Sequence, residues 1–193
     1  MANQDIGTPR FYCDYINYRL SRGVGQANTF DVMATNTGNN LVGIKTNGGT
    51  EAELFDMRPL NLVTFDTAAS SASKADGVVV ALDVMGQTSS KISFIAILNH
   101  NMPTATGRFK IAASDTKEDI QAFDFGSATA IVPTEVVNGD TINGSSPYEV
   151  TPATDGSTIV RFAESDLRYW GIQFEGSNSN NFSSTDLTVG CIM

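Results

Sequence analysis

The chain has 193 residues and a mass of 20.6 kDa, enough to bury about 70% of the surface that the unfolded chain exposes, so folding requires neither a metal nor a disulfide. No apolar run approaches the roughly 18 residues of a membrane helix, which excludes a transmembrane class. Lys plus Arg number 12 against 21 Asp plus Glu, giving a net charge of -9 and no basic stripe for nucleic-acid phosphates. We expect one domain that binds neither a membrane nor DNA or RNA.

The composition favours short strands joined by many turns. Gly, Ser, Thr and Asn make up 69 of the 193 residues, whereas charged residues are only 17%. The first five residues, Met1 to Asp5, carry no basic segment and no apolar core of the kind that directs secretion. We therefore expect the chain to fold in a cytoplasm.

Residues 1 to 23 form a separate element that we interpret as an N-terminal arm, preceding a domain over residues 24 to 193. Four aromatic residues lie close together in it: Phe11, Tyr12, Tyr15 and Tyr18. Such a cluster is costly to leave in water. The arm therefore lies over its own domain as a short helix, or it anchors into a neighbouring subunit. In the second alternative these four residues are the candidate partner-binding site.

From residue 24 onward, apolar residues alternate with a period of two in short runs. The runs at 77 to 84 and 92 to 98 are apolar on both faces, whereas that at 108 to 113 predicts a half-buried strand with Phe109, Ile111 and Ala113 facing inward. Further runs follow at 159 to 162, 170 to 175 and 187 to 193.

No segment of ten or more residues shows strong helical periodicity, so no crossover helices are available for an α/β fold. Three stretches dense in Asn, Gly and Ser are expected to be loops: 36 to 47, 137 to 155 and 176 to 184. The sequence predicts an all-β fold, an antiparallel β-sandwich with an N-terminal arm.

The sequence contains few of the residues and motifs that catalysis requires. His100 is the single histidine and follows the most apolar strand, where a ring hydrogen-bonded to turn backbone is the expected role. The chain also lacks a G-x-S-x-G nucleophile elbow. We expect no enzymatic activity and no cofactor.

Acidic clusters are the remaining candidates for catalysis or metal binding. Asp115, Glu118 and Asp119 follow a strand, in a context typical of a turn or a short helix cap rather than of a pair of catalytic carboxylates. Asp140 and Asp155, with nearby Asn residues, are candidate calcium ligands, although the regular calcium-loop spacing is missing. No metal site is assigned.

The two cysteines, Cys13 and Cys191, lie near opposite ends of the chain. Their spacing fits neither a zinc ligand pair nor a redox C-x-x-C motif. Two alternatives are open: two buried thiols, or a disulfide between the chain ends, which often meet in a folded domain.

Carbohydrate is the ligand class that the composition favours, because aromatic rings and amides suit sugar rings and hydroxyls. Two aromatic residues stand where such a role is conceivable. Trp170 shares the inward phase of Ile172 and Phe174, which predicts a core position, and Tyr148 follows the Gly144 to Pro147 loop.

Five segments of the chain form a recognisable series: the opening Pro9 to Tyr12, 92 to 102 (ISFIAILNHNM), 106 to 115 (TGRFKIAASD), 168 to 174 (RYWGIQF) and 187 to 190 (LTVG). These segments resemble parts of the discoidin-like, galactose-binding-like jelly rolls of tailed-phage virion proteins. The order and spacing of these segments carry the resemblance more than any single one.

The resemblance implies a jelly roll of about eight strands that works by binding. Its first implication is a structural component of a tailed-phage virion, such as a head decoration, neck or tail subunit. That subunit assembles in the host bacterial cytoplasm, in many copies or as a homo-oligomer, through contacts with other capsid, neck or tail proteins. The alternative implication is a carbohydrate-binding module for recognition of the host surface, with a glycan as partner.

Overall fold

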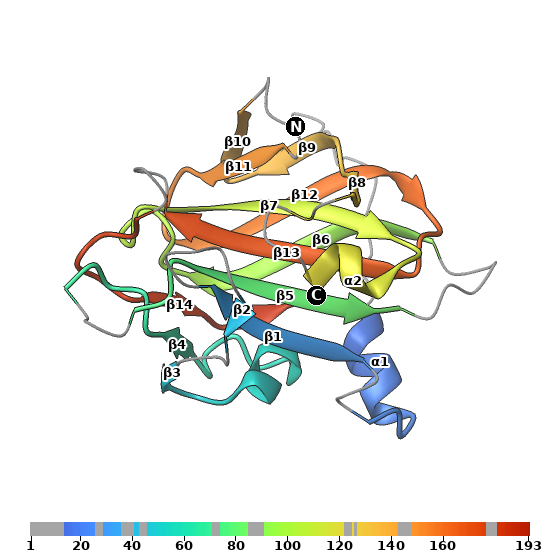
Figure 1. Ribbon diagram of the computed structural model, residues 1–193, viewed down its shortest axis with the longest axis horizontal. Helices are drawn as coiled ribbons and strands as arrows, with labels where there is room; N and C mark the ends of the chain where they lie inside the picture. The colour runs from blue at the N-terminus through green and yellow to red at the C-terminus, as the bar shows by residue number, and fades with distance from the viewer. Residues whose placement is uncertain are drawn as a thin grey trace, which may run out of the picture.

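The computed structural model describes residues 14–25, 29–35, 41–42, 46–70, 74–84, 91–121, 125, 127–142, 148–176 and 181–193. Phe11, Tyr12 and Cys13 lie outside these residues. The described chain is built mainly from antiparallel strands, with short helical segments between them (Figure 1).

The largest sheet has eight strands in the order β10-β11-β7-β13-β5-β1-β2, with β8 paired to β7. Every pairing in this sheet is antiparallel. Its strands are β1 (Phe30–Thr35), β2 (Leu41–Val42), β5 (Gly77–Asp83), β7 (Gly107–Ser114), β8 (Thr129–Ala130), β10 (Gly139–Ile142), β11 (Glu149–Pro152) and β13 (Tyr169–Gly176).

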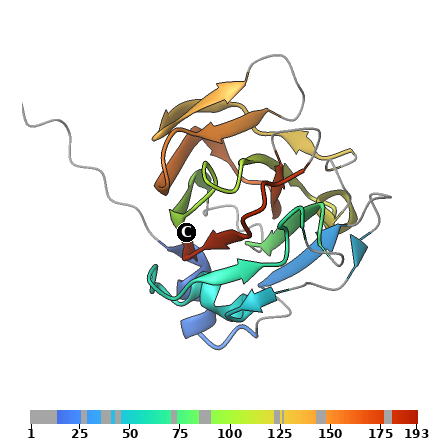
Figure 2. The ribbon, with the colours of Figure 1, turned by 90° about the vertical axis from the view of Figure 1, so that its left-hand side faces the viewer.

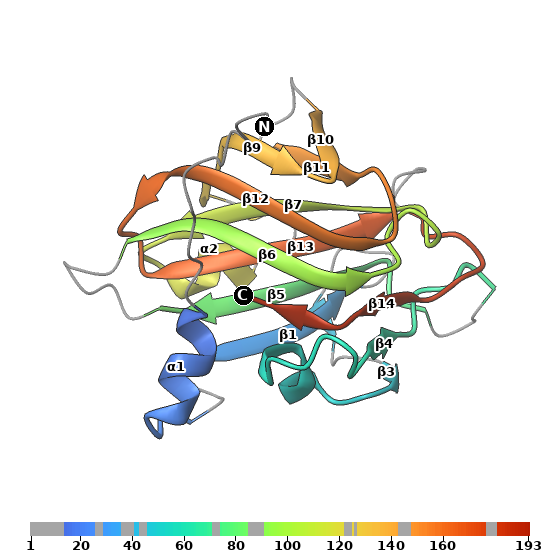
Figure 3. The same ribbon diagram turned by 180° about the vertical axis from the view of Figure 1, so that it is seen from behind.

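A four-stranded sheet packs against one face of the large sheet, as the view from behind shows (Figure 3). Its order is β15-β6-β12-β9, from strands β6 (Ile92–His100), β9 (Pro133–Val137), β12 (Gly156–Ser165) and β15 (Cys191–Ile192). A small third sheet, in the order β14-β4-β3, comprises β3 (Thr46–Gly48), β4 (Val63–Phe65) and β14 (Leu187–Val189). The antiparallel β-sandwich predicted from the sequence is confirmed.

The main hydrophobic core lies between the two larger sheets. Alternate residues of β13, namely Trp170, Ile172 and Phe174, are at most 1% exposed and point into it, as the sequence pattern predicts. Facing residues come from β6 and β12, such as Ile97 and Val160, both 0% exposed. Burial of such side chains is the main source of stability of the fold.

The helical segments are short. Within the described ranges they are α1 (Tyr15–Ser21), the 3-10 helix η2 (Glu51–Phe55) and α2 (Lys117–Gln121). Among the described residues, no helix has the length and the apolar composition needed to cross a bilayer.

Helix α1 packs against the sandwich. The Asp14 side chain caps it by accepting a hydrogen bond from the Asn17 backbone N–H at 2.9 Å. The Asn17 side chain in turn donates to the Phe55 carbonyl at 3.0 Å, and Ile16 is 4% exposed within the main core. Figure 2 shows the C-terminus close to this helix.

Two local predictions are wrong. Strand β7 is buried on both faces, not half-buried, because the side of Lys110 and Ala112 is covered as well. The stretches from 137 to 155 and from 36 to 47, both expected to be loops, contain strands as well: β10 and β11 in the first, β2 and the start of β3 in the second. Strand β11 also pairs with β7, and this contact extends the sheet over a segment with little apolar periodicity.

Candidate ligand-binding site

The outer face of the large sheet, which points away from the main core, divides into three regions. Its middle is covered by α2 and Phe125, which form a second hydrophobic cluster with Val79, Ala81 and Ala112. Gly171 makes this cover possible, since a side chain at that position would collide with the Phe125 ring and lie 2.7 Å from Ile120. The two ends of the face are polar.

One end holds a compact cluster of buried charges. Glu175 accepts hydrogen bonds from Arg108 at 2.8 Å and from Gln173 at 2.9 Å, and it lies 3.1 Å from the Lys110 ammonium. Glu149 pairs with the same two cations at 2.7 and 3.7 Å. Two cations and two carboxylates cancel one another, so this cluster is a closed internal network that joins β7, β11 and β13 rather than a site for a ligand.

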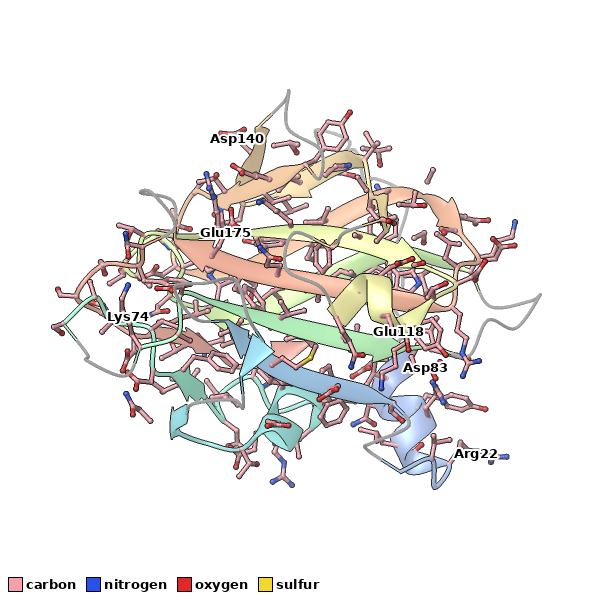
Figure 4. The ribbon with its side chains drawn as sticks, viewed as in Figure 1. Arg22, Lys74, Asp83, Glu118, Asp140 and Glu175 are labelled. Atoms are coloured by element: carbon pink, nitrogen blue, oxygen red, sulfur yellow. The ribbon has the colours of Figure 1, made fainter. Side chains whose placement is uncertain are left out.

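The opposite end contains a hollow of about 220 Å³, which we call the outer hollow. Figure 4 shows Asp83, which lines it, and Glu175 of the charge cluster at opposite ends of the sheet. Its lining comes from β1, β5, α2 and β13 together with the residues just before β1 and β13: Thr29, Phe30, Asp31, Ala81, Leu82, Asp83, Lys117, Ile120, Arg168 and Tyr169.

Arg168 and Tyr169 form a stacked wall of the outer hollow. The Arg168 guanidinium carbon lies 4.7 Å from the centre of the Tyr169 ring, a cation-π arrangement. The same guanidinium makes a two-point pair with Asp83, with distances of 3.0 Å from Nε to Oδ1 and 2.9 Å from Nη2 to Oδ2. This hydrogen bonding raises the pKa of Arg168, which therefore stays charged.

Asp31 and Lys117 form the other polar part of the lining. Asp31 accepts a hydrogen bond from the Gln121 side chain at 2.9 Å, which ties β1 to the end of α2. Lys117 is the first residue of α2. The hollow therefore combines hydrogen-bond acceptors, cationic donors and an aromatic ring over an apolar floor that includes Ala81 and Ile120.

A second hollow of about 240 Å³, which we call the end hollow, opens beside α1. Its lining is mostly apolar: Tyr15, Ile16, Leu82, Val84, Lys91, Ile92, Ser93, Phe94, Ile95, Trp170 and Met193. Trp170 is fixed there by a hydrogen bond from its Nε1 to the Leu167 carbonyl at 2.9 Å and by stacking on Phe162 at 5.2 Å between ring centres.

The arm residues that the structure describes differ in exposure. Tyr15 packs against the main core, whereas Tyr18 is 54% exposed, and their rings stack at 6.3 Å between centres. Phe11 and Tyr12 lie outside the described residues. The partner-binding role predicted for these four residues therefore stays a prediction.

The two aromatic residues considered for sugar binding are elsewhere than in the outer hollow. Trp170 is 1% exposed in the main core, which confirms the position predicted from its phase. Tyr148 is half-buried directly before β11. The buried Trp170 ring offers no face to a sugar, whereas the role considered for Tyr148 stays a prediction.

His100 has the structural role predicted for it. Its Nδ1 accepts a hydrogen bond from the Met102 backbone N–H at 3.3 Å, so the proton of the neutral ring is on Nε2, which donates to Thr158 Oγ1 at 2.9 Å. Burial lowers the pKa of His100 to about 4. His100 is 2% exposed, so its ring is not accessible to act as a base at the surface.

Three of the acidic candidates, Asp115, Asp119 and Asp155, accept hydrogen bonds within the fold, Asp115 from the Arg168 backbone N–H at 3.3 Å. Asp119 accepts from the Ser114 hydroxyl at 2.8 Å within the turn into α2, as predicted for a helix start. Asp155, one of the two candidate calcium ligands, accepts from both the backbone N–H and the hydroxyl of Thr104. Asp140 lies on β10 (Figure 4). Across the described ranges, no group of three or more His, Cys, Asp or Glu side chains is placed to hold a metal.

Cys191 is a free, buried thiol. Burial, reinforced by the negative charge of Asp14, raises its pKa to about 11. Cys13 lies outside the described residues, so both alternatives, a disulfide between the chain ends or two buried thiols, stay predictions.

Sequence reasoning missed the outer hollow. Its charged members, Asp31, Asp83, Lys117 and Arg168, come from four distant parts of the chain, and no motif links them. The available signal is the phase of β13, since Tyr169 is out of step with the inward-facing Trp170 and must reach the opposite face.

No family model and no curated protein matches this chain. Solved structures of carbohydrate-binding modules do resemble it. Chitosan-binding module 1 from a chitosanase/glucanase of Paenibacillus sp. IK-5 aligns with 10% identity and a TM-score of 0.50, over 86% of this chain and 92% of that one.

Chitosan-binding module 2 of the same enzyme, solved with chitotriose, aligns with 13% identity and a TM-score of 0.44 over 86% of this chain and 95% of that one. A pectin-binding carbohydrate-binding module aligns with 15% identity and a TM-score of 0.43 over 80% and 90%. None of these matches supports the virion assignment implied by the sequence resemblance. Together with the strand order, the first match establishes a β-sandwich of the kind found in carbohydrate-binding modules.

Proposed function

We propose that the chain is a non-catalytic carbohydrate-binding domain whose ligand site is the outer hollow. The observation that carries the proposal is the convergence, in about 220 Å³, of the Tyr169 ring with two carboxylates and two cationic side chains. This volume lies below the roughly 300–1,000 Å³ of sites for drug-sized ligands, so it suits a single sugar ring.

The chemistry of the lining matches that of a sugar. Each hydroxyl of a sugar both donates and accepts hydrogen bonds, so the Asp31 carboxylate serves as an acceptor while Lys117 and Arg168 serve as donors. The wall formed by Arg168 and Tyr169 offers a flat surface against which the less polar face of the ring packs. Because Arg168 is fixed by Asp83, little side-chain entropy is lost on binding.

The fold supports this proposal by analogy only. The module with the TM-score of 0.50 is named as a chitosan-binding module, but one fold hosts many functions. The proposal therefore depends on the lining of the outer hollow, and it predicts no particular sugar.

The direct test is a glycan array followed by calorimetric titration of the best hit with full-length variants. Lys117→Ala removes a donor and should weaken binding about tenfold or more, because a hydrogen bond to a charged group is lost. The matched control is Lys91→Ala, whose ammonium pairs with Glu164 near the exposed surface and lines the end hollow instead. This control should bind as the natural chain does.

A second pair of variants tests the aromatic wall. Tyr169→Ala should bind the glycan measurably more weakly than the natural chain does, whereas Tyr148→Ala should bind it with unchanged affinity. Thermal unfolding of each variant verifies that the fold is retained. Absence of any glycan hit at millimolar concentration, or a hit that binds Lys117→Ala and Tyr169→Ala as well as the natural chain, contradicts the proposal.

The virion role remains a second proposal, and an exposed apolar loop supports it. Leu60 is 86% exposed, Met57 54% and Leu62 42%. The loop is held in place, since the Pro59 carbonyl accepts a hydrogen bond from the Asn99 side chain at 2.7 Å. A fixed loop with protruding apolar side chains is typical of protein–protein contact. In this proposal the chain is a virion subunit that assembles in the bacterial cytoplasm.

For this second proposal, we expect Leu60→Ser to fold normally but to be depleted severalfold from purified virions, as measured by quantitative mass spectrometry. Val132→Ser is the control, because Val132 is another exposed apolar residue, at 54%, but lies outside the loop. Equal incorporation of the two variants would count against a role of the loop in assembly.

A further inference from the structure

The two carboxylates that line the outer hollow both have partners within the fold. Asp83 accepts two hydrogen bonds from Arg168, at 3.0 and 2.9 Å, and its Oδ1 also lies 3.9 Å from the guanidinium of Arg19, which is 4% exposed. Asp31 accepts a hydrogen bond from the Gln121 side chain at 2.9 Å. Asp83 is therefore neutralised by two cations before any ligand arrives.

The two cations of the lining keep unused hydrogen-bond donors. The pair with Asp83 occupies N–H groups of Nε and Nη2, on one side of the Arg168 guanidinium. Within the described chain, the other end of this guanidinium, formed by Nη1 and the second N–H of Nη2, has no partner, and the side chain is 43% exposed. Lys117 is half-buried, and no described residue forms an ion pair or a hydrogen bond with its ammonium.

Helix α2 separates these donors from the acceptor on Asp31. The Asp115 side chain, two residues before Lys117, accepts a hydrogen bond from the Arg168 backbone N–H at 3.3 Å, so the start of α2 lies next to Arg168. The other end of the helix is tied to Asp31 through Gln121. An α-helix rises about 1.5 Å per residue, so these two ends lie about 6 Å apart along α2. A six-membered sugar ring with its substituents spans such a distance.

We infer that the outer hollow selects sugars that carry a carboxylate, such as hexuronic acids, an inference that rests on the proposed carbohydrate site. The carboxylate of the sugar accepts hydrogen bonds from the free end of the Arg168 guanidinium and from the Lys117 ammonium. Hydroxyls on the opposite side of the ring donate to Asp31, while the ring itself packs against the wall formed by Arg168 and Tyr169.

Sugars of other charge fit this lining less well. A neutral sugar leaves both cations without an anion. An amino sugar can pair its ammonium with Asp31, but it then covers Lys117 and Arg168 and removes water from them without supplying a negative charge. The charges of the lining therefore discriminate among sugars of the same size.

The experiment compares sugars that differ only in charge. The methyl glycosides of a hexuronic acid, of its methyl ester, of the neutral hexose and of the 2-amino sugar, each in the gluco and the galacto series, are titrated calorimetrically into the full-length chain. The acid should bind about tenfold more tightly than its ester, because the ester cannot form hydrogen bonds between charged groups. The affinity for the acid should also fall severalfold between about 50 and 500 mM NaCl, because salt screens the attraction.

Lys117→Gln tests the source of the selectivity. Glutamine keeps a hydrogen-bond donor but removes the charge, so the ratio of the affinities for acid and hexose should fall about tenfold. Because Lys117 has no ion-pair partner in the described chain, the variant should keep the melting temperature of the natural chain. Lys91→Gln is the matched control, since it removes the same charge outside the outer hollow, and its affinity ratio should equal that of the natural chain. If Lys117→Gln fails to fold, the comparison of acid with ester carries the test.

The outcomes separate this inference from the proposed function. If the hexose or the amino sugar binds as tightly as the acid, and Tyr169→Ala weakens that binding, the carbohydrate site stands and the selectivity for acids is wrong. Equal affinity ratios in the natural chain and in folded Lys117→Gln also overturn the selectivity. If no sugar of any charge binds to a chain that unfolds cooperatively, the proposed function fails, and the inference fails with it.

Discussion

At the scale of single residues, His100 shows how burial determines the role of an ionisable group. Both ring nitrogens are engaged, one as acceptor from the Met102 backbone and one as donor to Thr158. The Thr158 hydroxyl continues the chain of hydrogen bonds to the Asn138 carbonyl at 3.2 Å. Protonation of Nδ1 breaks the bond from Met102 and places a charge in a buried site, which is consistent with the low pKa.

This arrangement predicts a specific pH dependence of stability. In the folded state the pKa of His100 is about 4, below the ordinary 6.5, so the unfolded chain takes up this proton first as the pH falls. The contribution of the neutral ring is full above pH 6.5 and is lost progressively between pH 6.5 and 4. The loss amounts to at most about 3 kcal/mol.

The measurement is urea unfolding of the natural chain and of His100→Gln between pH 4.5 and 7.5. The difference in unfolding free energy between them should shrink as the pH falls, because glutamine does not titrate. A difference that stays constant over this range contradicts the assignment of the transition to His100.

At the scale of elements, the cover of α2 and Phe125 over the outer face depends on the absence of a side chain at Gly171. Ile120, which is 0% exposed, packs directly above this glycine. The same helix supplies Lys117 and Ile120 to the outer hollow, so its position sets the shape of the candidate site.

We therefore expect Gly171→Ala to displace α2, to lower the unfolding free energy by about 1–3 kcal/mol and to weaken glycan binding together with it. Gly25→Ala is the control, because an added side chain there meets nothing within 4 Å. Thermal unfolding and limited proteolysis near residue 121 provide the readouts. Natural stability of Gly171→Ala would show that the cover is not tightly packed.

The sequence predicts a strand correctly where burial of one face makes apolar residues alternate. The prediction fails where the strand is held by polar or charged contacts with distant parts of the chain. The inward residues of β7 and β13 are assigned correctly, since Phe109 and Phe174 alternate with residues of the other face. The burial of Lys110 is not predictable, because it depends on carboxylates from β11 and β13 that lie far away in the sequence. The alternation of apolar residues does not predict strand β10 either, because the residues that pair with β11 include the polar Asp140 and Thr141.

At the scale of the whole molecule, the fold class follows from composition and periodicity, but the candidate site does not. A dense supply of turn residues and short alternating runs is sufficient to predict a sandwich. Asp31, Lys117 and Arg168 line the same hollow because the strand order brings their segments together. No pattern in the sequence around any of the three residues indicates this. The proposed virion role rests on the resemblance of short segments and on the exposed loop around Leu60, whereas the proposed carbohydrate site rests on the lining of the outer hollow.

The place of β13 also has a consequence for how the chain folds. This strand lies between β5 and β7 in the centre of the large sheet, although it is made long after both (Figure 1). Ile172 of β13 pairs with Val80 of β5 on one side and with Ile111 of β7 on the other. Until β13 is synthesised, β5 and β7 therefore each have an edge without a partner strand. Such distant pairing slows folding and leaves the nascent chain open to association until its last quarter emerges from the ribosome.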